Sequence, residues 1–177
     1  MLNGFCLTTA TKIELQKIYE WKIEEEYPEH FTCRPVNKIY DFETFSENLL
    51  DLVKKHKIIH KILSKENKIV GEIKAFDYNM RNKSIEFGYY LPKKYRGLGY
   101  GTIMIELFLK ELFEDDDLAL NKIYATTCEV NYPSIKVLEK TGFTLDGKNR
   151  EHYWIGDKKY TQNVYSLLRS EWILHNL

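Results

Sequence analysis

Three glycines at alternate positions dominate the stretch 95–102: Gly97, Gly99 and Gly101. A strand-like run over residues 85–91 precedes this stretch, and a helix-like run over residues 103–113 follows it. A strand, a glycine loop and a helix N-terminus in this order aim backbone N–H groups at an anion, most often a phosphate. Glycine also has no Cβ to block a close approach, and it tolerates positive φ. The sequence therefore predicts an anion-binding loop with the charge of Arg96 beside it, and an ordinary glycine-rich turn is the alternative.

The overall composition narrows the class of protein. The chain has 177 residues and a formal net charge of zero, which argues against a broad nucleic-acid-binding surface. No apolar run approaches the roughly 20 residues that cross a bilayer, and the N-terminal residues lack the pattern of a secretory signal. The cysteines form no CxxC pair and no metal-ligand spacing; they are Cys6, Cys33 and Cys128. We expect one cytoplasmic domain over residues 1–177, with no metal, nucleic acid or membrane as partner.

Hydrophobic periodicity and capping residues place the other elements. Helices are expected from Thr11 toward the acidic run 24–26, at about 41–55, and at about 131–141, where Asn131 is a good N-cap. Residues 27–40 are expected to form a loop. Strands are expected at 5–7, 58–63, 68–76, 85–91, 122–127, 143–145, 153–155 and 163–168.

The glycine stretch can be compared with three known designs of phosphate-binding loop. A P-loop needs Lys and then Ser or Thr after its last glycine, but Gly101 is followed by Thr102 and Ile103. A dinucleotide fingerprint GxGxxG needs glycine where Thr102 or Met104 stands. The third design, Arg/Gln-x-x-Gly-x-Gly/Ala, is satisfied by residues 96–101.

The third design resembles the acetyl-CoA pyrophosphate motif of the GCN5-related N-acetyltransferases, the GNAT family. A second segment agrees, because Asn131-x-x-Ser134 and the Lys-Thr-Gly-Phe at 140–143 are similar to the Asn-x-x-Ser and Lys-x-Gly-Phe segment of that family. The element order fits over almost the whole chain. Residues 147–172 look most like the branch of ribosomal-protein N-terminal and spermidine acetyltransferases. The resemblance implies a single α/β (α+β) GNAT domain, with a mixed central sheet of about six to seven strands, helices on both faces, and strands that splay at the acetyl-CoA site.

The resemblance also implies which residues hold acetyl-CoA. Backbone amides of residues 98–102 would bind the pyrophosphate. The strand backbone at 89–91 would pair with the pantetheine arm and supply an N–H to the oxyanion, and Asn131 would fix the far end of that arm. The expected cofactor-binding residues are Tyr89, Tyr90, Leu91, Arg96, Gly97, Leu98, Gly99, Tyr100, Gly101, Thr102, Asn131, Ser134 and Lys140.

Acetylation of an amine also needs a base, because an ammonium has no lone pair, and a proton donor for the departing thiolate. Glu86, on the strand that leads to the loop, is the candidate base, acting directly or through water. An exposed or paired carboxylate is the alternative for Glu86, and Glu151 with His152 is the rival base. Ser134 is the candidate donor to sulfur, unless it only caps its helix. Many members of the family carry Tyr four residues after this serine, where the chain has Leu138.

The acceptor is predicted from charge. In this family the first helices and their loop wall the acceptor cleft, and here that segment contains Glu25, Glu26 and Glu29, to which we add Glu151. An acidic lip would attract a cationic amine such as a polyamine, an aminoglycoside or a protein N-terminus, although a charge run is more often a solvated face.

The expected function is that of an acetyl-CoA-dependent N-acetyltransferase that works by direct attack in a ternary complex, with a homodimer left open. One alternative is a non-catalytic acyl-CoA-binding or sensing module of the same fold, which Leu138 favours. The other is a nucleotide-binding enzyme with an atypical glycine loop, which the missing lysine disfavours.

Overall fold

The computed structural model describes residues 4–25, 32 and 41–175. The elements follow one another as β1 (Phe5–Thr8), α1 (Lys12–Ile23), α2 (Phe42–Lys54), β2 (Ile58–Lys65), β3 (Lys68–Asn79), β4 (Ser84–Tyr90), the 3₁₀ turn η2 (Lys93–Tyr95), α3 (Tyr100–Glu114), β5 (Lys122–Cys128), α4 (Tyr132–Lys140), β6 (Thr144–Ile155), β7 (Lys158–Leu168) and α5 (Arg169–His175).

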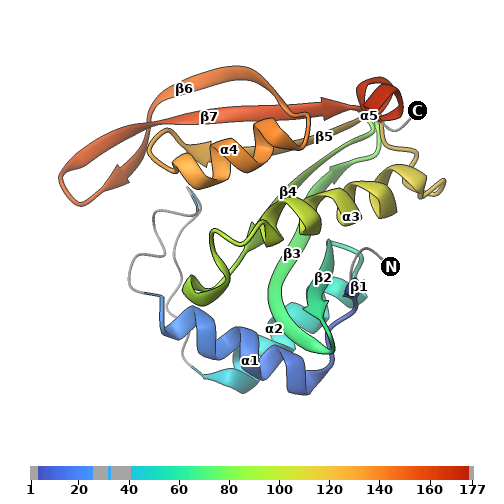
Figure 1. Cartoon of the computed structure of the whole chain (residues 1–177), viewed down its shortest axis with the longest axis vertical. Helices are drawn as coiled ribbons and strands as arrows, with labels where there is room; N and C mark the ends of the chain where they lie inside the picture. Colours follow the sequence, from blue (N-terminus) through green and yellow to red (C-terminus); the bar gives the residue numbers. More distant parts are fainter. Residues whose placement is uncertain (1–3, 26–31, 33–40, 176–177) are drawn as a thin grey trace.

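One sheet contains the seven strands of the described residues, in the order β1-β2-β3-β4-β5-β7-β6. All neighbouring pairs are antiparallel except β4 and β5, which are parallel. Figure 1 shows α1 and α2 beside the β1–β4 half of the sheet and α4 beside the other half, with α3 running between them. The mixed, open α/β sheet expected from the sequence is therefore confirmed.

The two faces of the sheet carry separate clusters of apolar side chains. Ile62 and Leu63 are neighbours on β2, so their side chains point to opposite faces. Leu63 belongs to the larger cluster, in which α3 buries Phe108 against strand residues such as Ile73. Ile62 belongs to the smaller cluster, in which α1 buries Ile18. Helices thus cover both faces, and the α1 face is the one on which the acceptor wall was expected.

The parallel strands β4 and β5 pair over only three residues each. Ser84–Glu86 pairs with Lys122–Tyr124, whereas β4 continues to Tyr90 and β5 to Cys128. The two strands therefore separate after Glu86, and Figure 1 shows them diverging away from α5. We call this opening the fork. The glycine loop follows the end of β4 after the short turn η2, so the fork opens toward it.

The C-terminal third differs from the expectation. The short strands predicted at 143–145 and 153–155 are the two ends of one strand, β6, whose pairing with β7 shifts register twice. β6 is an edge strand with mostly exposed side chains, so it lacks the alternating hydrophobic pattern by which strands are recognised. β7 accordingly starts at Lys158 rather than at 163, and the helix α5 was not predicted.

Two further expectations concern the first half of the chain. The predicted loop 27–40 lies outside the described residues except for Thr32. Of the helices that the structure describes, none has the length and apolarity that a bilayer span requires.

Candidate active site

The glycine loop between η2 and α3 has a backbone that needs glycine. Gly97 and Gly99 have φ angles of +75° and +78°, in the left-handed region that other residues rarely adopt. A Cβ built at either position would meet no protein atom within 4 Å. Glycine is therefore required at these positions by the backbone conformation and not by packing. The absence of side chains also lets a ligand approach the loop backbone closely.

The helix that follows this loop begins without a side-chain cap. Gly99 is its N-cap residue and makes no capping hydrogen bond. The first N–H groups of an α-helix have no acceptor within the helix, so those of residues 100–102 are available at the loop, at the positive end of the helix dipole. Gly97, Leu98 and Gly99 are exposed. A pyrophosphate fits this arrangement, because exposed amide donors of this kind are what an anion requires.

Arg96, at the start of the loop, contacts two other parts of the site. Its Nη2 donates to Oε2 of Glu25 at 2.6 Å, and its Nε donates to the carbonyl oxygen of Leu91 at 2.8 Å. Its guanidinium also lies over the ring of Tyr90, 5.6 Å from the centroid. Arg96 therefore joins the glycine loop to the end of β4 and to the segment after α1.

Glu86 lies at the apex of the fork, in the last residue pair between β4 and β5. Its half-buried carboxylate accepts a hydrogen bond at Oε1 from the hydroxyl of Thr126 on β5, at 3.0 Å. Strand alternation puts Glu86, Gly88 and Tyr90 on the face that α1 covers. The predicted base is thus placed at the end of the opening, on the predicted acceptor side.

Tyr89 points to the opposite face of the sheet, toward the start of α4. Its hydroxyl donates to Oγ of Ser134 at 3.5 Å, and burial raises the pKa of Tyr89. Asn131 caps α4 by accepting the N–H of Ser134 at 3.3 Å through Oδ1. The structure therefore brings three predicted residues together. Leu138, one turn further along α4, is only 1% exposed and belongs to the core.

Other predicted residues lie apart from this group. Lys140 is exposed in the last turn of α4, at the opposite end of that helix from Asn131. Glu151 is exposed on β6, where its carboxylate pairs with Lys159 at 2.7 Å. The neighbouring His152 is also exposed. The predicted acceptor contacts Glu26 and Glu29 lie outside the described residues.

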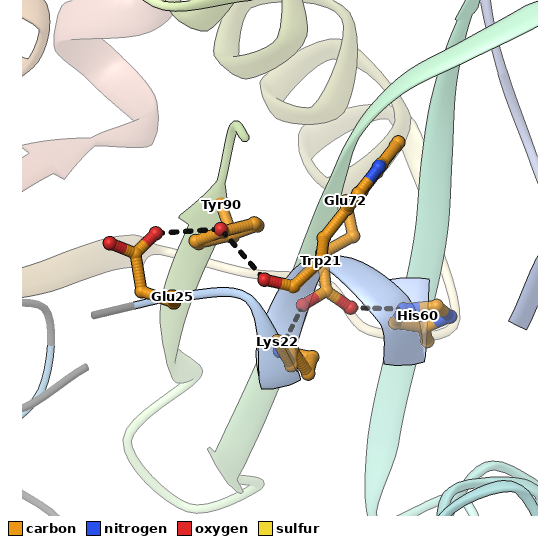
Figure 2. A network of polar contacts seen from close by, with 6 residues as sticks. All are labelled: Trp21, Lys22, Glu25, His60, Glu72 and Tyr90. Atoms are coloured by element: carbon orange, nitrogen blue, oxygen red, sulfur yellow. Dashed lines mark hydrogen bonds and ion pairs between the residues drawn. The ribbon is translucent and has the colours of Figure 1, made fainter. Parts of the chain in front are cut away.

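Glu25 is the predicted acceptor contact that the structure places beside the fork. Figure 2 shows the hydroxyl of Tyr90 between the carboxylate of Glu25, at 2.7 Å, and the carbonyl oxygen of Trp21, at 3.3 Å. Burial opposes ionisation of Glu25, but hydrogen bonds from Tyr90 and Arg96 outweigh it and lower the pKa of Glu25. Burial and the neighbouring Glu25 carboxylate raise the pKa of Tyr90. The end of α1 is therefore attached to the end of β4.

A second polar cluster holds α1 to β2 and β3, and sequence reasoning missed it. Glu72 is 3% exposed, and Figure 2 shows it between Lys22, whose Nζ lies 2.5 Å from Oε1, and His60, whose Nε2 lies 2.9 Å from Oε2. Burial opposes the charge of Glu72, but Lys22 and the hydrogen bond with His60 hold its pKa well below its ordinary value. A glutamate within the apolar run 69–76 was the available signal, because a buried carboxylate needs partners.

The arrangement therefore combines three chemical features: loop amides that can bind an anion, strand backbone beside an opening, and a carboxylate at the end of that opening.

Comparisons with known proteins agree with this arrangement. The model of the GNAT acetyltransferase domain matches residues 5–144. The SPbeta prophage-derived uncharacterized N-acetyltransferase YokL of Bacillus subtilis (strain 168) is 34% identical over 113 residues, which are 63% of this chain and 62% of that protein. The chain spans about three fifths of the length of the curated relatives it matches.

Solved structures with low sequence identity share the fold. Spermidine N-acetyltransferase from Vibrio cholerae, in complex with CoA and spermine, superposes with a TM-score of 0.84 at 17% identity, over 96% of this chain and 98% of that one. Ribosomal L7/L12 α-N-protein acetyltransferase, in complex with coenzyme A, superposes with a TM-score of 0.81 at 14% identity, over 93% and 94%. The family match covers β1 to the first residue of β6, including the glycine loop, the fork and α4, and the chain accordingly belongs to the GNAT acetyltransferase family.

Proposed function

We propose that the protein is an acetyl-CoA-dependent N-acetyltransferase that moves an acetyl group to a primary amine by direct attack in a ternary complex. The observation that carries the proposal is the fork. β4 and β5 separate after three residue pairs, and β4 then leads to a glycine loop with an uncapped helix. A strand edge beside an anion site suits a ligand with an amide-containing arm and a pyrophosphate, because strand backbone pairs with amides and helix N-termini bind phosphates.

The residues present fit acetyl-CoA. Backbone amides of the exposed loop and of the first turn of α3, at 98–102, would bind the pyrophosphate, and the backbone of β4 beyond Glu86 would pair with the pantetheine amides. Asn131 uses Oδ1 to cap α4, and its Nδ2 is a donor that this cap does not use. Arg96 would border the pyrophosphate from its place between Glu25 and Leu91. Bound acetyl-CoA supplies an acetyl group activated as a thioester.

The chain's own groups would then meet the proton demands of the reaction. Glu86, at the apex of the fork, takes a proton from the incoming ammonium, directly or through water. A backbone N–H of β4 donates to the carbonyl oxygen as negative charge develops on it. Ser134, in the first turn of α4, is the proposed proton donor to the departing sulfur, and its Oγ accepts a hydrogen bond from the hydroxyl of Tyr89.

The proposed acceptor is a cationic amine, either a polyamine-like small molecule or a protein N-terminus. The relatives named for spermidine and for a ribosomal protein make these the first amines to test. Glu25 and Glu151 are the proposed acceptor contacts among the described residues. Each already has one cationic partner, Arg96 and Lys159 respectively, so their net attraction for a further cation is reduced.

An amine screen tests this function. The full-length protein is incubated with acetyl-CoA and spermidine, an aminoglycoside, or peptides with free N-termini, and the release of CoA thiol is measured. Amine-dependent release well above the amine-free rate is expected for at least one class, with mass spectrometry locating the acetyl group on nitrogen. Tight binding of ATP or NAD without binding of CoA would contradict the proposal.

Glu86→Gln tests the base. We expect kcat to fall on the order of 10²- to 10⁴-fold, the usual contribution of general base catalysis, with little change in acetyl-CoA affinity. Glu151→Gln is the comparison variant, because Glu151 is the rival base and is exposed on β6; a larger fall in kcat there than in Glu86→Gln would assign the base to Glu151 instead. Unchanged turnover in Glu86→Gln would remove Glu86 from the mechanism.

The second candidate function is a non-catalytic acyl-CoA-binding or sensing module. Leu138 favours it, because a core leucine that is 1% exposed occupies the position of the tyrosine found in many relatives. Tight CoA binding by calorimetry with no thiol release across the amine panel would select this candidate. Turnover with any amine would exclude it.

A further inference from the structure

The fork has a side-chain bridge across its closed end, between Thr126 and Glu86. The last residue pair between β4 and β5 joins Glu86 to Tyr124, and Thr126 lies two residues further along β5, where the strands have separated. Residues two apart on a strand share a face, so Thr126 lies on the same face as Glu86. Its hydroxyl donates back across the opening to Oε1 of Glu86, at 3.0 Å.

We propose that Thr126 is a positioning residue for the transfer reaction, which holds the carboxylate of Glu86 in the orientation that receives the amine proton. This inference rests on the proposed function and goes beyond it. It assigns a role to Thr126, which lies outside both the glycine loop and the second family segment. Thr126 belongs to β5, so the base on one branch of the fork is oriented by the other branch.

The chemistry of the contact supports this role. A glutamate side chain has several rotatable bonds, and a hydrogen bond from a short β-branched residue restricts it, because threonine is itself stiff at χ1. An ionised carboxylate has about four lone-pair sites, and the hydrogen bond from Thr126 occupies one of those of Glu86. A hydrogen bond to a charged group is also stronger than one between neutral groups.

The chain offers a matched control one residue away. Thr127 points to the opposite face and is 3% exposed, and its Oγ1 has no hydrogen-bond partner among the described residues. Replacing either threonine by valine removes one hydroxyl from β5 and keeps the shape of the side chain. Only the change at 126 removes a hydrogen bond to Glu86.

The experiment measures kcat, KM for acetyl-CoA and melting temperature, with the amine that the screen identifies. Thr126→Val should lower kcat by about ten- to hundredfold, the range for losing a hydrogen bond to a charged group, with KM for acetyl-CoA and melting temperature close to wild type. Thr126→Ser should recover most of the activity, because it restores the hydroxyl. Thr127→Val should behave like wild type.

A double variant separates positioning from a merely structural effect. If Thr126 acts through Glu86, adding Thr126→Val to Glu86→Gln should change kcat by less than about twofold, because the two residues act as one unit. An equal loss in both backgrounds, or wild-type kcat in Thr126→Val, would overturn the inference. Failure of both Thr126→Val and Thr126→Ala to fold would overturn it as well, by showing a structural contact. An inactive wild type would instead contradict the proposed function itself.

Discussion

The glycine loop and the end of α1 face the same site but are built in opposite ways. The loop uses consecutive residues and backbone groups, with Gly97 and Gly99 at positive φ and no side-chain cap on α3. The end of α1 is held by charged side chains from distant segments, of which Glu72 is the centre. Backbone geometry is sufficient where every member of a family binds the same ligand group. Where the ligand differs between members, side chains can be exchanged to change the specificity without changing the fold.

We expect the largest effect, a fall in melting temperature, from removing Glu72, the buried centre of the polar cluster that holds α1. Glu72→Ala leaves His60 buried without its anion and removes the partner of Lys22. Removing one partner of a buried charge pair costs about 3–5 kcal/mol, so a large fall in melting temperature is expected in thermal unfolding. Asp51→Ala, in an exposed pair with Lys55, is the control and should leave the melting temperature nearly unchanged.

Acid titration should weaken the same cluster without a mutation. The pKa of Glu72 in the folded protein is well below its ordinary value of 4.5, so its ionised form stabilises the fold above that value. This contribution is lost as pH falls below 4.5 toward the folded-state pKa. Denaturant unfolding between pH 6 and roughly pH 3 should therefore show a steeper loss of stability in wild type than in Glu72→Gln. Parallel curves would show that Glu72 does not carry this dependence.

A substitution in the glycine loop should cost less stability than the loss of Glu72, but it should strongly weaken the binding of CoA. Gly99→Val forces a β-branched residue to a φ of +78°, at a cost of about 1–3 kcal/mol. It also places a side chain where the pyrophosphate is proposed to bind. We expect CoA affinity, measured by calorimetry, to fall by more than about tenfold. Gly147→Ala, at a glycine with open space around it, is the control, and unaltered affinity in Gly99→Val would refute the loop assignment.

We expect the smallest effect, a change in KM for the amine, from removing the charge of Glu25 at the end of α1. Glu25→Gln removes the charge that binds Arg96 and Tyr90, and we expect KM for a cationic amine to rise by about three- to tenfold, as one partly screened charge contributes about 1 kcal/mol. Glu151→Gln, in an exposed pair, should change that KM by less than about twofold. Equal effects in the two variants would show that proximity to the fork does not decide acceptor binding.

The contrast also explains what the sequence could predict. The loop, the start of α4 and the strand that carries Glu86 have local signals: glycine spacing, an N-cap and strand alternation. These predictions agree with the structure in position. No local signal exists for Thr126 beside Glu86, because that contact depends on how two strands separate. The continuous strand β6 was missed for a related reason, since an exposed edge strand has no buried face to impose a pattern.

The parallel pairing of β4 and β5 has a consequence for the order of folding. Antiparallel neighbours such as β2–β3 and β6–β7 are joined by short turns, so little chain entropy is lost when they form. β4 and β5 are separated by residues 91–121 and share only three residue pairs. Closing that long segment gains few contacts until α3 has packed. We therefore expect the pairing of β4 with β5, and with it the fork, to form after the local hairpins on either side.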